Sequence, residues 1–327
     1  MNLRKFTFYN YNYAPSFDNN IVSLFKQSLN NNPMKTNIIF LIIASLFASI
    51  SYAQIDVNKS KLEIDKVDKN IYLFIQQTNI ANPTSVVYTS PEASILIDPG
   101  FKQMQSIISD SINTLNGGEI KFLMTTHFHI DHAQAIEDYY NNTTILLSDI
   151  QYKNAAKDIK NVISSKNEYH LKLGNEELQI HSLPNNSGHT GEDAVFYFKK
   201  ANMLIVGDYL FQDMYPIIDV KSGGSIDGYF NNIDYILSLA NDYTKLIPGH
   251  TSFKKVENRY ISKKQYESHI EKLKKSMSII SSKKSKGLKL EEIIEQGLPD
   301  EFKSFNEGMK YVSQDKWIAF IYNNISR

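Results

Sequence analysis

Short apolar runs separated by turn residues dominate the chain after residue 54. The first three runs cover residues 71–76, 85–89 and 94–97, and they are rich in the Val, Ile, Tyr and Leu residues typical of strands. The third run stops at Asp98-Pro99-Gly100, which is a turn signal. Apolar residues then recur at helical spacing over residues 102–115. The pattern predicts a fold that mixes strands and helices.

The same alternation continues to the C-terminus. Further strands are predicted at residues 120–125, 143–147, 178–183, 194–198, 203–206 and 245–247. Further helices are predicted at residues 131–140, 226–239, 302–309 and 314–322. The strands fall into two β-rich halves that we expect to join near Ser165. A Gly-rich loop at residues 221–225 precedes the helix at 226–239, and a mobile cover over the substrate is one hypothesis for residues 211–228.

Polar residues of metal-binding type follow several of the predicted strands. Four strands are each expected to end at such a residue, namely His127, His189, Asp208 and His250. Loops at strand ends are where a rigid sheet presents functional groups. The pattern therefore predicts one shared site.

The strongest single signal is His127-Phe-His129-Ile-Asp131-His132. The chain has only 8 histidines in 327 residues, so this clustering has a chance likelihood on the order of one in several thousand. Imidazole and carboxylate groups suit zinc and similar divalent ions. Four of them in so short a span cannot all reach one tetrahedral ion, but they fit two ions side by side. The motif therefore predicts a two-metal hydrolase.

Composition and net charge indicate which kinds of molecule the protein binds. Hydrophobic content of 42% with 21% charged residues is ordinary for a globular protein. The formal net charge is zero, so nothing indicates a nucleic-acid partner. The one basic concentration, residues 254–286, alternates with Glu and Ser and is interpreted as a solvated helix face. We expect a small-molecule substrate.

The N-terminal region predicts export. Residues 34–53 contain Met-Lys at the start, an apolar stretch over 38–50 and small residues before Gln54, which together are typical of a signal peptide. Residues 1–33 are polar and read as a leader upstream of the true start at Met34. The apolar stretch is short for a membrane span, which needs about 20 residues, and an uncleaved anchor is the alternative. With no cysteine in the chain there is no lipid-attachment site. A periplasmic or secreted protein, without membrane insertion after cleavage, is expected.

Five ordered motifs carry a resemblance to a known family. They are Ile97-Asp98-Pro99-Gly100, Thr126-His127-Phe-His129-Ile-Asp131-His132, Gly188-His189-Thr190, Gly207-Asp208 and Pro248-Gly249-His250. Over residues 69–252 the chain resembles the metallo-β-lactamase superfamily. The resemblance implies an α+β fold, a four-layer αββα sandwich with the site between the edges of two sheets. We expect that domain to span residues 54–254, with a C-terminal helical extension over 255–327 packed on it.

The resemblance also implies the metal ligands and their chemistry. The first zinc would be held by His127, His129 and His189, and the second by Asp131, His132 and His250, with Asp208 bridging both. A His₃ set leaves an open position for water, and zinc lowers the pKa of such a water to about 7. Asp131 would then orient the resulting hydroxide and accept a proton.

Residues outside the ligand set are less specific. For Asp98 a turn at the end of a strand explains the residue as well as a hydrogen bond to a ligand histidine. The other histidines, His170, His181 and His269, are interpreted as surface or half-buried residues.

Departures from the best-known zinc β-lactamases bear on the substrate. Asp208 stands where that subclass has a cysteine, and Phe211 stands where it has a lysine that binds the substrate carboxylate. Lys221 in the Gly-rich loop is the candidate substitute. An oxygen ligand at the bridge also admits iron or manganese in place of zinc. Tyr209 or Tyr215 could donate to a developing oxyanion, although core packing explains these aromatics more simply.

The predicted function is zinc-dependent hydrolysis of a cyclic amide or ester carbonyl by a metal-bound hydroxide. A β-lactam antibiotic is the first-named substrate because export brings the protein to where β-lactams are met. A lactone or another ester or thioester is the alternative, and a mononuclear iron persulfide dioxygenase is a more distant one. Flavodiiron proteins of this superfamily carry an acidic residue at the position of His129, so the histidine argues against that function. RNA processing fits an exported, uncharged chain poorly, and a non-catalytic binding protein would be favoured by a lost ligand, whereas none is lost.

Overall fold

The computed structural model describes residues 55–79, 81–115, 117–139, 143–154, 162–165, 168–251, 259–306 and 312–325. The predicted leader and signal peptide, residues 1–53, lie outside the described residues, as does the predicted domain junction at 254–255. No helix within the described ranges combines the length and the apolarity needed to cross a bilayer.

The first sheet contains seven strands in the order of the sequence. Their bounds are β1 Lys61–Lys66, β2 Ile71–Gln77, β3 Thr84–Thr89, β4 Ser94–Ile97, β5 Ile120–Met124, β6 Thr144–Ser148 and β7 Val162–Ser165. Strands β1 to β4 pair antiparallel, whereas β4 to β7 pair parallel. Parallel strands need crossover connections, and the helical segments here are η2 Lys102–Met104, α3 Gln105–Thr114, α4 Ile130–Ala133, η3 Gln134–Tyr139 and α5 Asp149–Asn154.

The second sheet contains six strands in the order β13-β12-β11-β10-β9-β8. Their bounds are β8 Glu168–Leu173, β9 Glu176–Ser182, β10 Ala194–Phe198, β11 Met203–Phe211, β12 Lys245–His250 and β13 Ile261–Ser262. Only β11 and β12 pair parallel, and α6 Ile226–Leu239 lies between them in sequence. The chain changes sheet between β7 and β8, which confirms two β-rich halves joined near Ser165.

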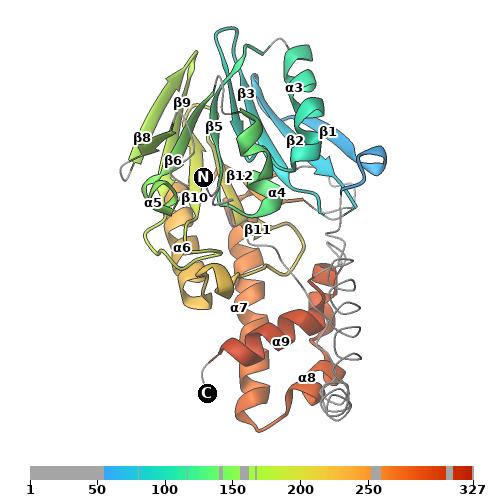
Figure 1. Ribbon diagram of the computed structural model, residues 1–327. Helices are drawn as coiled ribbons and strands as arrows, with labels where there is room; N and C mark the ends of the chain where they lie inside the picture. Colours follow the sequence, from blue (N-terminus) through green and yellow to red (C-terminus); the bar gives the residue numbers. More distant parts are fainter. Residues whose placement is uncertain are drawn as a thin grey trace, which may run out of the picture.

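Alternating side chains on β11 show how the layers are formed. Met203 and Ile205 pack into the core between the two sheets, whereas Leu204 and Val206 pack into the core that contains α6. Successive strand residues point to opposite faces, so one strand supplies two cores. On the other side of the molecule, Ile108 of α3 packs against the outer face of the first sheet. Helices therefore cover both outer faces, as Figure 1 shows, and the predicted αββα sandwich is confirmed.

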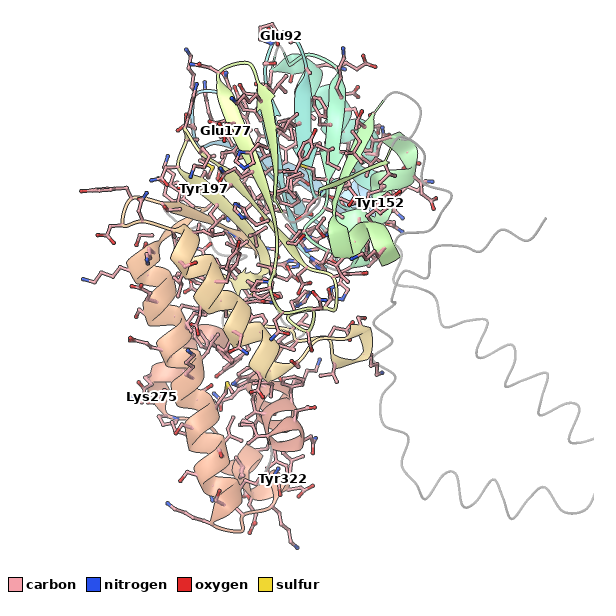
Figure 2. The ribbon with its side chains drawn as sticks, turned by 90° about the vertical axis from the view of Figure 1, so that its left-hand side faces the viewer. Glu92, Tyr152, Glu177, Tyr197, Lys275 and Tyr322 are labelled. Atoms are coloured by element: carbon pink, nitrogen blue, oxygen red, sulfur yellow. The ribbon has the colours of Figure 1, made fainter. Side chains whose placement is uncertain are left out.

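The C-terminal part of the chain is helical. It consists of α7 Lys263–Ser285, α8 Leu290–Gln296, η5 Asp300–Asn306 and α9 Gln314–Asn324. Helix α7 begins at a capping box in which Ser262 and Gln265 satisfy each other's backbone N–H groups. Figure 2 shows α7 running beside α6 and beyond the sandwich, and both helices contribute to one apolar core. The solvated face predicted for α7 is present at Lys275, whose side chain is 57% exposed and pairs with Glu301.

Some elements differ from the sequence expectation. Strand β1 was not predicted because Lys61–Lys66 is mostly charged, as suits the edge of a sheet. Strand β11 continues past Val206 to Phe211 because it goes on pairing with β12, at Gly207 with Pro248 and at Phe211 with His250. The predicted helix at 302–309 is the 3₁₀ segment η5, and residues 307–311 lie outside the described part. The bounds 54–254 and 255–327 stay predictions.

A histidine in the C-terminal helices leads us to expect that the stability of the protein depends on pH. His269 on α7 lies 5.0 Å, ring to ring, from Phe305. Burial, together with the charge of Lys272, lowers its pKa from 6.5 to about 4. Between these values the unfolded chain takes up a proton that the native state does not, so the free energy of unfolding should decrease as pH falls. The expected decrease from this residue is up to about 3 kcal/mol between pH 7 and pH 4.

Urea titrations at several pH values check this expectation. A His269→Gln variant is the control because it removes the titrating group and keeps a polar side chain of similar length. The difference in unfolding free energy between the variant and the parent should change with pH in the window from 6.5 to 4. A constant difference across that window would contradict the expectation.

Candidate metal centre

The histidine motif follows the end of β5. The strand ends at Met124, and the chain continues through Thr125 and Thr126 to His127. His129 is the N-cap residue of α4 and has an extended backbone conformation. The following helical turn carries Asp131 and His132. An extended segment and a helical turn in succession thus direct four polar side chains to the same edge of the sheets.

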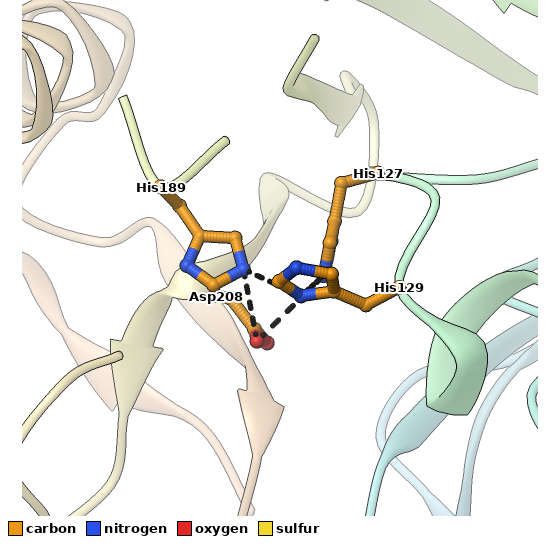
Figure 3. Close-up of side chains that lie close together, drawn as sticks. All are labelled: His127, His129, His189 and Asp208. Carbon is orange, nitrogen blue, oxygen red and sulfur yellow. Dashed lines mark hydrogen bonds and ion pairs between the residues drawn. The ribbon is translucent and has the colours of Figure 1, made fainter. Parts of the chain in front are cut away.

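The first group of side chains consists of His127, His129, His189 and Asp208 (Figure 3). His129 Nδ1 lies 3.0 Å from His127 Nε2 and 3.0 Å from His189 Nε2. Asp208 Oδ2 lies 3.3 Å from His189 Nε2. His189 is on the loop between β9 and β10, and Asp208 is on β11. The fold thus brings together ligand candidates from three separate parts of the sequence.

Each of these histidines has an inner ring nitrogen that faces the group and an outer ring nitrogen that faces away from it. The outer nitrogens have hydrogen-bond acceptors. His189 Nδ1 lies 2.8 Å from the carbonyl oxygen of Ile217, and His129 Nε2 lies 3.2 Å from Asp219 Oδ2. His127 Nδ1 lies 3.0 Å from Thr126 Oγ1, and that hydroxyl donates its own hydrogen to Asp98. Each outer nitrogen therefore carries the proton, and in a neutral ring the inner nitrogen is left with a lone pair.

The second group consists of Asp131, His132 and His250. His132 Nε2 lies 3.2 Å from His250 Nε2, and His250 Nε2 lies 3.3 Å from Asp131 Oδ2. His132 Nδ1 lies 3.0 Å from Asp98 Oδ2. The inner nitrogen of His132 therefore also has a free lone pair when the ring is neutral. Strand β12 contributes His250 as its last residue.

Asp208 lies between the two groups. While Oδ2 faces the first group, Oδ1 lies 3.2 Å from His132 Nε2 and 3.5 Å from His250 Nε2 in the second. Space for the carboxylate depends on Gly249, because a Cβ atom there would collide with Asp208 Oδ1. One buried carboxylate thus lies within 3.7 Å of nitrogens of four histidines, His127, His132, His189 and His250.

The electrostatics of the protein alone favour cation binding. Burial, with the charge of His132, lowers the pKa of His127 well below its usual value, and burial also lowers the pKa of His189. Burial opposes a charge on His250 too, but Asp208 and Asp131 outweigh it and raise its pKa to about 9. His127 and His189 are therefore neutral imidazoles, the form that binds metal. The second group attracts positive charge.

The donor set fits metal ions on these observations. Three lone-pair nitrogens converge at 3.0 Å contacts beside a carboxylate in the first group. Lone pairs that face one another repel unless a proton or a cation lies between them. Imidazole and carboxylate ligands suit zinc, and also iron and manganese. The structure thus indicates a metal site formed by the seven residues that the sequence proposed as ligands, whose individual ligand roles stay predictions.

Asp98 is a hydrogen-bonding centre behind both groups. Its carboxylate accepts from the backbone N–H of Thr126 at 2.6 Å and from the Thr125 hydroxyl at 3.1 Å, besides its contact with His132. Asp98 has a φ of 55°, in the left-handed region that non-glycine residues rarely adopt. Aspartate tolerates this region better than most residues, and the hydrogen bonds to its carboxylate hold it there. Asp98 is therefore both the predicted turn residue and the predicted partner of a ligand histidine.

Replacing Asp98 with alanine is expected to lower the free energy of unfolding by about 3 kcal/mol, because buried donors lose their acceptor. The donors are the Thr126 N–H and the His132 ring. Chemical denaturation measures the loss. Asp98→Asn is the matched control, since it keeps an acceptor oxygen and tolerates a positive φ, and it should lose less. Equal stability of Asp98→Ala and the parent would contradict this role.

Asp219 and Ile217 were not identified from the sequence. Both lie on the segment between β11 and the short η4 (Val220–Ser222), and they contact His129 and His189 respectively. Asp219 is 90 residues from His129 along the chain. No local pattern links residues so far apart, and a backbone carbonyl such as that of Ile217 has no sequence signal at all.

The comparisons with known proteins begin with the fold. No family model matches the chain. A metallo-β-lactamase from Pontibacter korlensis superposes with a TM-score of 0.54 and 16% identity, covering 63% of this chain and 96% of that one. The DIM-1 metallo-β-lactamase exposed to ceftazidime gives a TM-score of 0.52 and 19% identity, covering 64% and 95%. At these identities the likeness establishes the fold.

A curated relative establishes the family. A protein of Methanocaldococcus jannaschii named as a probable metallo-hydrolase is 30% identical over 174 residues, covering 48% of this chain and 82% of the relative. The chain belongs to the metallo-β-lactamase superfamily. Its enzyme class is accordingly that of a hydrolase.

Two tyrosines predicted as substrate contacts are buried in this metallo-β-lactamase fold. Tyr209 is 2% exposed, and its hydroxyl donates to Asp193 at 2.6 Å and accepts from the His189 N–H at 3.1 Å. Tyr215 is fully buried and packs against Trp317. Burial favours core packing, the role that the sequence already favoured, and contact of either hydroxyl with a substrate stays a prediction. Strand β11 and the C-terminal helices enclose both side chains.

Lys221 remains a candidate for substrate binding. It is exposed on η4, two residues after Asp219, which contacts His129.

The remaining histidines lie outside both metal groups. His170 pairs with Glu177 on the surface, and the ring of His181 is buried with Nδ1 at 3.2 Å from the Tyr235 hydroxyl.

Proposed function

We propose that the protein is a zinc-dependent hydrolase that opens a cyclic amide or ester, with a β-lactam as the first substrate to test. The observation that carries the proposal is the pair of ligand groups that share Asp208. Two divalent ions side by side would supply Lewis-acid polarisation of the carbonyl and an acidified water molecule. Iron or manganese in place of zinc is compatible with the oxygen ligands.

The protein residues position the reacting groups. Asp131 has the most exposed side chain of the seven, at 17%, and so reaches the open side of the centre. Burial opposes its ionisation, but His132 and His250 outweigh burial and lower its pKa to about 2. The carboxylate is therefore ionised at neutral pH and can accept a hydrogen bond from an attacking water, holding its orientation towards the carbonyl carbon.

A specific observation favours lactones or other esters as the alternative. Phe211 is 1% exposed and its ring stacks on His250 at 5.3 Å with an interplanar angle of 8°. In the best-known zinc β-lactamases a lysine at this position binds the substrate carboxylate. Phe211 cannot do so, which leaves Lys221 as the candidate cation. A substrate without a carboxylate would need neither residue.

We also propose that the protein is exported, as the predicted signal peptide at residues 34–53 suggests. Expression of the full chain followed by mass spectrometry of the secreted or periplasmic fraction tests this. A mature N-terminus near Gln54 supports export and cleavage. Intact full-length chain retained in the cytoplasm would contradict it.

Metal content and hydrolysis test the function together. The purified protein should contain two zinc ions per chain, and it should hydrolyse nitrocefin in a manner abolished by a chelator and restored by zinc. Two zinc ions without nitrocefin turnover would exclude a β-lactam and direct the assay to lactones and thioesters. A single iron would overturn the hydrolase mechanism in favour of a persulfide dioxygenase.

A further inference from the structure

We propose that the stacked pair of Tyr215 and Trp317 positions the loop that orients two histidines of the metal centre. The C-terminal helices would then help to set the affinity for metal. This inference rests on the proposed metal centre and assigns two positioning residues to it. Both act through the segment that connects β11 with η4.

That segment provides the acceptors for the outer ring nitrogens of two histidines in the first ligand group, His129 and His189. The carbonyl of Ile217 accepts from His189 Nδ1 at 2.8 Å, and the carboxylate of Asp219 lies 3.2 Å from His129 Nε2. The backbone N–H of Asp219 also donates to the carbonyl of His189 at 2.8 Å. Such outer partners fix the orientation of ligand rings. The position of the segment therefore determines where two inner nitrogens point.

Local hydrogen bonds hold Asp219 within its turn. Its carboxylate accepts from the backbone N–H of Lys221 at 3.1 Å and from the Ser222 hydroxyl. The backbone N–H of Gly224 donates to the Asp219 carbonyl at 2.8 Å. These bonds all lie within five residues of one another.

The turn is also joined to the loop that carries His189. The Gly191 N–H donates to the Ser222 carbonyl at 2.8 Å, and the Ser225 N–H donates to the Gly188 carbonyl at 3.0 Å. These bonds leave the end of the segment nearer β11 to be held by other contacts.

Tyr215 anchors the segment at the end nearer β11. Its ring stacks on Trp317 at 5.5 Å with an interplanar angle of 19°, and it meets Phe305 edge-on at 5.0 Å. Tyr215 is only two residues before Ile217. Pro216 lies between them, and a proline fixes its own φ and restricts the residue before it. Few backbone torsions can therefore absorb a shift between the aromatic contact and the Ile217 carbonyl.

Trp317 is itself held firmly by the helices. It is 1% exposed on α9, and its indole N–H donates to the Ser276 hydroxyl of α7 at 2.8 Å. Helices α7 and α9 thus fix the position of the indole ring that Tyr215 stacks on. Packed side chains with so little free volume transmit displacement instead of absorbing it. The chain of contacts runs from Ser276 through Trp317 and Tyr215 to the ligand histidines.

Zinc affinity of the full-length mature protein tests the proposal, measured by competition with a chromophoric chelator. Trp317→Ala is expected to weaken binding about 10-fold, the lower end of the cost of losing a direct outer partner. Trp317→Phe retains an aromatic ring for stacking and should restore most of the affinity. Asp219→Ala, which removes a direct partner, should weaken binding about 10- to 100-fold. If Trp317→Ala does not fold, Tyr215→Leu tests the same contact from the loop.

Ile293→Ala is the matched control. Ile293 is a fully buried residue of α8 in the same apolar core, and it is not part of the contact chain to the loop. The variant should lose stability while keeping the zinc affinity of the parent. Equal weakening in Ile293→Ala and Trp317→Ala would overturn the proposal, because loss of core packing alone would then explain the effect.

Trp317 also supplies a readout independent of activity, since it is the chain's only tryptophan. Coupling between two sites is reciprocal, so zinc binding should change the emission of Trp317 in the parent and in Ile293→Ala. Suppose that the parent binds zinc, that zinc does not change the emission of Trp317 in the parent, and that Trp317→Ala keeps the zinc affinity of the parent. In that case only this inference fails. If the parent binds no divalent metal at all, the proposed function fails with it.

Discussion

Replacing Asp208 with alanine is expected to lower kcat/KM by about 10³-fold or more. The reason is that both ligand groups lose the same carboxylate. Its Oδ2 lies 3.3 Å from His189 Nε2 and its Oδ1 lies 3.2 Å from His132 Nε2. Charge stabilisation by a bound metal is worth several kcal/mol, and about 1.4 kcal/mol corresponds to a factor of ten in rate.

Metal analysis shows whether the loss has this cause. The alanine variant should bind fewer metal ions per chain than the parent under the same dialysis conditions. Asp208→Asn is the control, since it keeps the shape and one oxygen but removes the charge, and it should fall between the two. If Asp208→Ala kept a full metal complement and parental kcat/KM, the carboxylate would not be shared between two ions.

Replacing Asp131 with asparagine is expected to lower kcat by about 10²- to 10⁴-fold with a smaller change in KM, the range for loss of a positioned proton acceptor. The amide keeps an oxygen towards His250, which lies 3.3 Å from the native carboxylate. It cannot take a proton. The effect should therefore appear in the chemical step and not in the binding of substrate.

The assay must be run with metal in excess, because Asp131 is also a proposed ligand. Metal content measured in parallel separates loss of the ion from loss of the proton acceptor. Asp131→Glu is a useful comparison, because it restores the carboxylate in a displaced position and should recover part of kcat. An unchanged kcat in Asp131→Asn at full metal occupancy would assign proton transfer to another group.

The fold was largely predictable because its strands have strong local signals. Strands β2, β4 and β5 are mostly apolar runs, and their predicted bounds differ from the observed ones by a single residue or less. The weak points were strands at sheet edges. β1 is mostly charged, and an edge strand that is half exposed gains little from apolar residues.

The ligand residues were predictable for a different reason. His127, His129, Asp131 and His132 are close in sequence, so local composition reveals them. His189, Asp208 and His250 were found through short motifs at predicted strand ends. Of these three only His250 is the last residue of its strand, because β11 continues past Asp208 and His189 lies on the loop after β9. For Tyr209 the sequence left two roles open, because its place next to Asp208 does not tell which way its side chain points. The structure turns it to Asp193, away from the metal groups.

The sequence by itself determined the family, the strands inside the two sheets and the residue types that can bind metal. Those features depend on local composition and spacing, which a single chain displays directly. Only the tertiary structure determined that Asp208 faces both groups, that Asp219 and Ile217 orient two histidines, and that Tyr215 packs on Trp317. These are contacts between distant segments. They depend on how sheets and helices pack, which no local pattern encodes.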